Sequence, residues 1–538
     1  MKRPILEWKS VGKTKRLKMP TTIALKMYNC LISDNLPAAE KILDYCEFHE
    51  EDLIELEERN ILSLAIQRGN VTVVTKLARL LKHGVNSNST TIGVVTPLHW
   101  ASEKGELEMV KELLNNGAFI DAQDKDQKTP LFRAVSQGKF AVVTELLQKG
   151  ANPNITDSFN TAPLQNAVAF QHESLVEELL QNGANPNNMS FDGDTALHFA
   201  SKIGALEIVE SLIAHKAKIN LPKDIDGKTP LHVACENQQV IIVKVLLQKG
   251  ADISKTDYQN STPLHSILEK GQTIKKINEI VSLLLENGVD VNGYQEFTYF
   301  APLHLAVDFN NVTLVKKLLQ NGANIDSRDC YNQTPLHMAV NQENVAIVRE
   351  LLKNGADPNI RIDVNFATQL QMQDEYYLSR RFHGWTPLHS AIDLRNNTIV
   401  SMLIENGANI NEPNAFLETP LHLAFYAGDD NFLKENISTR KLKNVDLNLQ
   451  DRKGRTVLHL AIGMNNARIV KKLLKVGTSA PDLTLRDIYG LTVFDEAFRI
   501  NRRKRGSKNS NEILRMIAKL ACPKPKISDP IYPLKFVI

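Results

Sequence analysis

Apolar residues recur along most of the chain at steps of three and four residues, in short stretches separated by polar links that contain glycine. One stretch carries the apolar positions Leu107, Val110, Leu113 and Leu114. This spacing places them on one face of a helix, with Gly117 suited to the left-handed position just past its end. A shorter apolar stretch ends at Gly105, which should break a preceding helix. The pattern therefore predicts pairs of short helices.

A tetrapeptide marks the start of each first helix. Thr96 can cap a helix, Pro97 fits its first turn, Leu98 begins the core, and His99 is expected to bridge to a nearby backbone or hydroxyl group. Identical copies begin at Thr229, Thr262, Thr334, Thr386 and Thr419, and looser copies at Thr129, Ala162, Thr195, Ala301, Thr456 and Thr492. Most of the 14 histidines occupy the fourth position of a copy, so we assign these to the scaffold and not to catalysis or metal binding.

Most copies follow one another at intervals of about 33 residues. A repeat of this length with this tetrapeptide resembles the ankyrin repeat, and the resemblance covers nearly the whole chain. It implies an all-α solenoid of about 14 helix-turn-helix units, joined by hairpin-like fingers, in which neighbouring units bury one continuous core. It does not identify a partner, because such arrays bind many unrelated proteins.

The predicted organisation has four regions. Residues 1–20 form a basic flexible tail, 21–91 degenerate N-terminal capping repeats, 92–520 the array, and 521–538 a tail that contains proline. The array has an insertion at about 359–384, and extra residues after Gly271 lengthen a second helix or the loop before it. Lys216 occupies a position held elsewhere by glycine, so that helix end is either strained or closed differently.

Composition narrows the possible functions. A net charge of +3 argues against a general nucleic-acid binder, and the sequence shows no motif for nucleotide, metal or cofactor binding and no catalytic motif. The five cysteines lack paired spacing, which predicts reduced, buried thiols. There is no apolar run of membrane-spanning length and no apolar secretory signal, so we expect no membrane insertion and a location in the cytoplasm or the nucleus.

Aromatic residues gather near the predicted fingertips and in the insertion, where Tyr, Trp and Arg together are typical of a protein-binding surface. The candidate partner-binding residues are Tyr294, Phe297, Tyr299, Tyr376, Tyr377, Arg380, Arg381, Phe382 and Trp385. Alternatively, each ring packs on a neighbouring finger, and the insertion is an inert loop. We expect a mixture, with the clusters at 294–300 and 376–385 exposed.

A run of basic residues follows the first helix of the last repeat. It is a candidate nuclear-localisation or anion-binding patch. It consists of Arg502, Arg503, Lys504 and Arg505. The alternative is a solvated loop between two helices.

These features predict a non-enzymatic scaffold that binds a protein partner through its concave finger and inner-helix surface. The alternative is a substrate-recruiting adaptor of a ubiquitin ligase. Ankyrin proteins of that kind carry a short C-terminal docking box, of which Pro533 and Leu534 are a faint counterpart here.

Overall fold

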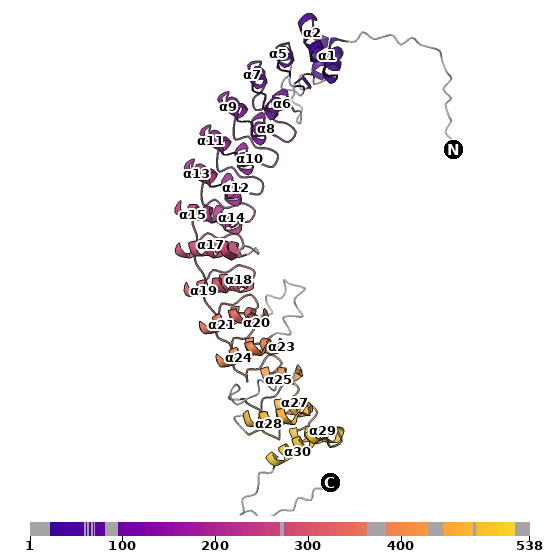
Figure 1. Cartoon of the computed structure of the whole chain (residues 1–538), viewed down its shortest axis with the longest axis vertical. Coiled ribbons are helices and arrows are strands. Elements are labelled where there is room, and N and C mark those ends of the chain that lie inside the picture. Colours follow the sequence, from indigo (N-terminus) through magenta and orange to yellow (C-terminus); the bar gives the residue numbers. More distant parts are fainter. Residues whose placement is uncertain are drawn as a thin grey trace, which may run out of the picture. The chain divides into compact units, whose positions relative to one another are not determined.

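The structure is a computed structural model that describes residues 22–58, 61, 64–65, 68, 70–80, 95–268, 274–362, 383–428, 445–476 and 480–521 (Figure 1). Within these ranges it contains helices and two isolated β-bridges, and no strand. The all-α prediction is therefore confirmed. The tail 1–20 and residues 522–538 lie outside the described residues, and the predicted region boundaries remain predictions.

The chain forms two compact units, Met1–Ala251 and Asp252–Ile538. The first begins with α1 (Ile23–Ile32), α2 (Leu36–Tyr45), α3 (Glu50–Glu58) and α5 (Val71–Leu80). Its regular helix pairs are α6 (Pro97–Lys104) with α7 (Leu107–Asn115), α8 (Pro130–Ser136) with α9 (Phe140–Gln148), α10 (Pro163–Ala169) with α11 (Glu173–Gln181), α12 (Ala196–Ile203) with α13 (Leu206–Ala214), and α14 (Pro230–Glu236) with α15 (Val240–Gln248). The first helix of each pair packs on the first helix of the next pair, and the second helix packs on the second. The two sets of helices form the two rows in Figure 1.

The second unit repeats this arrangement. Its helices are α16 (Pro263–Leu268), α17 (Ile274–Glu286), α18 (Pro302–Asp308), α19 (Val312–Gln320), α20 (Pro335–Asn341), α21 (Val345–Lys353), α23 (Pro387–Asp393), α24 (Asn397–Glu405), α25 (Pro420–Tyr426), α27 (Val457–Gly463), α28 (Ala467–Val476), α29 (Val493–Arg503) and α30 (Lys508–Ala521). Helix α17 has 13 residues where α19 has 9, so the extra residues after Gly271 lengthen a second helix. No helix in the described ranges is both long enough and apolar enough to cross a bilayer.

The tetrapeptide starts each first helix as predicted. In α6, the Thr96 hydroxyl accepts a bond from the backbone N–H of His99, and Pro97 is the first helical residue. Leu98 is buried, and Gly105 ends the helix with a φ of 82°. Each tetrapeptide position therefore has a local role that its side chain dictates.

In most repeats the tetrapeptide histidine also ties its repeat to the next one. His99 Nδ1 accepts from the Thr96 N–H at 3.2 Å, so its Nε2 carries the proton and donates to the carbonyl oxygen of Lys128 at 2.9 Å. His198 reaches Lys228 in the same way at 3.1 Å, and His422 reaches Arg455 at 3.0 Å. We call this pair of contacts the histidine clamp.

The second helices end in a left-handed residue, as the glycine pattern predicts. Lys216, which replaces a glycine, also adopts this conformation. Gly150 and Gly183 have φ values of 91° and 86°, and Lys216 adopts a φ of 68° at the equivalent position. The Ala217 N–H bonds to the Leu212 carbonyl at 2.9 Å, as the Ala151 N–H does to Leu146 at 3.0 Å. The closure at Lys216 is therefore the ordinary one, and a left-handed lysine there costs about 1 kcal/mol.

Burial keeps the clamp histidines neutral and should make stability depend on pH. It lowers the pKa of His198, His304 and His389 from 6.5 to about 4. As the pH falls below 6.5, these histidines become protonated in the unfolded chain but stay neutral in the folded protein. We therefore expect the free energy of unfolding to fall between about pH 6.5 and 4, by about 2 kcal/mol per histidine at pH 5.

The chain contains its own control for this prediction. Gln165 occupies the histidine position in α10, where its Oε1 accepts from the Ala162 N–H at 2.7 Å and its Nε2 donates to the Asp194 carbonyl at 2.7 Å. Glutamine thus makes the clamp without a titratable group. A variant with His198→Gln, His304→Gln and His389→Gln should match the wild type in denaturant unfolding at pH 7.5 and be less acid-sensitive. Equal acid sensitivity would refute the assignment.

Candidate protein-interaction surface

Most links between helix pairs fold into tight fingers around an aspartate side chain, and Ser190 and Asn414 take its place in two of them. In the finger before α10, Asp157 Oδ1 accepts from the N–H groups of Phe159 and Thr161, each at 2.9 Å. Asn160 closes the turn with a φ of 57°, a left-handed conformation that Asn tolerates. These bonds leave the Phe159 side chain at the tip.

Neighbouring fingers are joined by backbone hydrogen bonds. In the first unit the Phe191 N–H donates to the Phe159 carbonyl at 3.1 Å. A Cβ on Gly193 would lie 2.2 Å from the Asp224 nitrogen, so the next finger requires glycine there. The corresponding donor and acceptor pairs of the second unit are Glu296 with Gln259, Cys330 with Thr298, Ala415 with His383, Arg452 with Phe416, and Ile488 with Lys453, at 2.9–3.2 Å. The fingertip backbone is therefore fixed.

Several fingertip aromatic side chains are exposed on this fixed backbone. In the first unit, Phe159 is 66% exposed and Phe191 is 72% exposed. In the second, Tyr258 and Tyr489 are 60% and 75% exposed. Large exposed apolar groups on a rigid frame lose little entropy on binding, which is typical of protein-binding sites.

The cluster at 294–300 combines exposed rings with one that packs. Tyr294, Phe297 and Tyr299 are all exposed, and the Tyr294 and Tyr299 rings stack with centroids 5.5 Å apart. Phe300 instead stacks on the clamp residue His304. In another finger the Arg452 guanidinium lies over the Phe416 ring, 5.7 Å from its centroid. The rings are thus a mixture of exposed and packed ones, as the sequence predicted.

The expectation that Trp385 is exposed is wrong. Its side chain is 4% exposed and packs on Ile362, with the partly buried Leu423 against them. The Ile362 N–H donates to the Trp385 carbonyl at 2.8 Å, and the Gly384 N–H donates back to Ile362 at 2.7 Å. Trp385 therefore closes the base of the insertion, where its ring lies beside the His389 ring.

The repeats on either side of the insertion remain stacked. Helix α20 packs on α23, and α21 packs on α24. The Asn359 amide donates to the Gly407 carbonyl at 3.1 Å and accepts from the Asn409 N–H at 2.7 Å. Asn154 makes the same pair of bonds to Gly183 and Asn185 where there is no insertion. The remaining insertion candidates, Tyr376, Tyr377, Arg380, Arg381 and Phe382, lie outside the described residues.

The basic run lies partly within a helix. Arg502 and Arg503 form the last turn of α29, which continues three residues beyond the expected end at Ile500 because cations stabilise a helix C-terminus. Lys504 caps the helix and Arg505 has a φ of 49°. All four side chains are exposed. The run is accessible, and its role in nuclear import remains a prediction.

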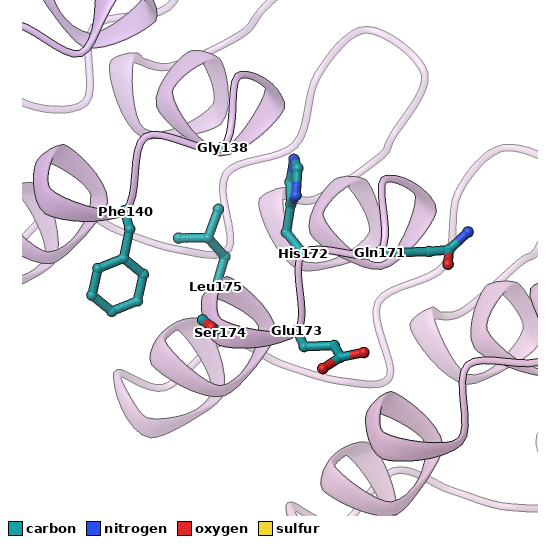
Figure 2. A pocket seen from close by; sticks show the side chains of 7 residues that line it. All are labelled: Gly138, Phe140, Gln171, His172, Glu173, Ser174 and Leu175. Carbon is teal, nitrogen blue, oxygen red and sulfur yellow. The ribbon is translucent and has the colours of Figure 1, made fainter.

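A pocket of about 480 Å³ lies at the turns of two neighbouring repeats in the first unit (Figure 2). Its lining consists of Gly138, Phe140, Gln171, His172, Glu173, Ser174 and Leu175. In Figure 2 the Glu173 carboxylate points away from the His172 imidazole. His172 instead lies over Gly138 and stacks on Phe170, with ring centroids 6.0 Å apart. The pocket thus brings no acid and base together.

The cysteine predictions hold in part. Among the described residues Cys30, Cys46, Cys235 and Cys330 form no disulfide. Cys235 is fully buried, and burial raises the pKa of its thiol. Contrary to the expectation of buried thiols, Cys46, which directly follows the end of α2, is exposed, and Cys30 and Cys330 are only partly buried. In the part of the chain that the structure describes, no group of three or more His, Cys, Asp or Glu residues could hold a metal ion.

Comparisons with known proteins agree with this geometry. A family model described as "Ankyrin repeats (3 copies)" matches residues 27–124, 62–157, 164–257, 222–295, 255–329, 273–362, 303–414, 363–438 and 396–487. The ankyrin repeat protein FPV031 of Fowlpox virus (strain NVSL) is 32% identical over 142 residues, which are 26% of this chain and 40% of that protein.

Two longer alignments involve proteins with a named activity. The E3 ubiquitin-protein ligase KEG of Arabidopsis thaliana is 31% identical over 345 residues, 56% of this chain and 20% of that protein. The phosphocholine transferase AnkX of Legionella pneumophila is 25% identical over 330 residues, 60% of this chain and 30% of that protein. The chain thus aligns with less than half of the length of each of these relatives.

Burial of Trp385 leads to a prediction about stability. Trp385→Ala should lower the free energy of unfolding by about 3–5 kcal/mol, because it removes a large buried side chain and leaves a cavity. Phe159→Ala, at an exposed fingertip, should change it by less than about 0.5 kcal/mol. Urea unfolding of both variants measures the difference, and equal stabilities would contradict the role assigned to Trp385.

Proposed function

The chain belongs to the ankyrin-repeat family, and we propose that it is a non-enzymatic scaffold that binds a protein partner along its fingertips and first helices. The observation that carries this proposal is the combination of a fixed fingertip backbone with exposed aromatic side chains. Phe159 and Phe191 are the best example, because a backbone hydrogen bond joins their fingers while both rings face solvent. A partner that covers them buries apolar area without having to order the loop.

Affinity purification with mass spectrometry would identify the partner and test this surface. A variant with Phe159→Ala and Phe191→Ala should weaken partner binding by about 2 kcal/mol or more and leave the melting temperature unchanged. The matched control is Phe140→Ala with Phe170→Ala, which removes two exposed rings at helix ends away from the fingertips. Equal loss of binding in both variants would count against the fingertips.

The insertion requires a separate variant. The sequence predicts a binding hot spot there, and Ile362 with Trp385 forms its base. Replacing residues 363–382 with a short Gly-Ser linker keeps that base, whereas deleting 359–384 would also remove Asn359 and Gly384. Unchanged partner recovery with the linker variant would exclude the insertion from the interface.

An alternative is a substrate-recruiting adaptor of a ubiquitin ligase, supported by the similarity to KEG over 345 residues. On this proposal the array recruits a substrate and the C-terminal tail docks the ligase. Recovery of a cullin or ligase subunit that depends on residues 522–538 would support the adaptor. Recovery of a partner without any ligase subunit would favour the scaffold. Whichever of these two functions the protein has, we propose that it is located in the cytoplasm or the nucleus.

A further inference from the structure

Charge is distributed unevenly along this chain. Residues 451–521 contain sixteen Lys and Arg against six Asp and Glu, a net charge of +10. The other 467 residues contain 48 and 55, a net charge of −7. The near-neutral total of +3 therefore conceals a strongly basic segment, and the argument from total charge against nucleic-acid binding does not apply to it.

The basic residues of this segment form stripes on two packed helices. Arg468, Lys472 and Lys475 recur at steps of four and three along α28, opposite its buried residues Ile469 and Leu473. Lys508, Arg515 and Lys519 lie along α30 in the same way, opposite the buried Ile513 and Ile517. Helices α28 and α30 pack side by side at the C-terminal end of the array (Figure 1). Both stripes therefore lie on the sides of two neighbouring helices that point away from the buried core.

The turn before α30 extends this surface. Residues 502–505 are exposed, and two hydrogen bonds join this turn region to the one between α27 and α28. Asn509 donates to the Asn465 carbonyl at 3.3 Å, and the Asn465 amide donates to Ser507 Oγ at 3.5 Å. We call the two stripes, Lys471 and residues 502–505 the basic face.

Few acidic groups neutralise the basic face. Glu512 is the one acidic residue in the sequences of α28 and α30. Within the described ranges no carboxylate forms an ion pair with Arg468, Lys471, Lys475 or Arg515. Partial burial and the nearby Arg468 guanidinium lower the pKa of Lys472. The positive charges therefore repel one another in the free protein.

Helix stability accounts for only part of this arrangement. Lys475, Arg502, Arg503 and Lys519 lie in the last turns of their helices, where a cation is favoured. Lys508 is the first residue of α30 and Arg468 the second of α28, where the positive end of the helix dipole disfavours a cation. Ion pairs do not account for Arg468 or Arg515 either, because neither pairs with a carboxylate within the described ranges. The charges that the fold itself does not need are best explained by an anionic ligand.

The residues between the charges narrow the class of ligand. The basic stripe of α30 is interrupted by Asn511 and Ala518, and neither α28 nor α30 contains an aromatic residue. Binding of single-stranded nucleic acid relies on aromatic stacking, and insertion of an amphipathic helix into a bilayer relies on bulky apolar side chains. Arg, Lys, Asn and Ser are the side chains that contact a phosphate backbone. We propose that the basic face binds duplex nucleic acid through its phosphates, without reading base sequence.

Fluorescence anisotropy with the full chain tests this proposal. The probes are labelled DNA and RNA duplexes of about 25 base pairs, titrated at several salt concentrations between about 50 and 250 mM. A variant with Arg468→Ser, Lys471→Ser and Lys475→Ser should bind at least tenfold more weakly. The slope of log K against log salt should become shallower by about 2 to 3, because three phosphate contacts are lost. A second variant, with residues 502–505 changed to Ser, should also bind the duplex more weakly and with a shallower salt dependence.

The matched control removes three exposed lysines in or directly after other second helices, by Lys244→Ser, Lys249→Ser and Lys353→Ser. This control should bind within about twofold of the wild type, and circular dichroism should show that all variants are folded. Duplex binding that is absent, insensitive to salt or equally reduced in the control would overturn the proposal. So would binding to phosphatidylserine vesicles or to polyglutamate in the absence of duplex binding. The duplex probe, DNA or RNA, that binds more tightly identifies the natural class.

Discussion

The structure depends on one repeated hydrogen-bonding unit, the histidine clamp. In most copies a side chain caps its own helix and also bonds a backbone carbonyl about 30 residues further on, whereas His265 and His337 make only the first of these contacts. His99 with Lys128 and His422 with Arg455 show that the geometry is nearly the same in both units. A single helix pair cannot bury its apolar side alone, so a bond that joins each repeat to the next also sets the register of the shared core.

The clamp and the other bonds between repeats explain which departures the fold tolerates. Gln165 replaces a histidine because its amide offers the same acceptor and donor. The insertion is tolerated because Ile362 and Trp385 pair at its base while Asn359 maintains the contact with the following repeat. An insertion is thus tolerated where the hydrogen bonds between the flanking repeats are kept. A scaffold of this kind can therefore vary its surface without altering its core.

Rigidity and surface chemistry are separate in this protein. The bonds that order the fingers use backbone atoms, so fingertip side chains such as Phe159 are free to differ from repeat to repeat. The second helices separate core and surface residues in the same way. In α28, Ile469 and Leu473 are buried in the core, whereas Arg468 and Lys475 face solvent. One array can therefore carry an apolar surface on its fingers and a basic face on its last outer helices.

The sequence alone determined the helix pairs of the regular repeats and the role of the tetrapeptide, because local capping and apolar periodicity act within a few residues. It also contained the basic segment, which a net charge taken over the whole chain concealed. Tertiary structure decided which aromatic residues are exposed. Trp385 lies one residue before its tetrapeptide and Phe159 three residues before its own, and one is buried while the other faces solvent. That difference depends on Ile362 and Leu423, which meet Trp385 only when consecutive repeats stack.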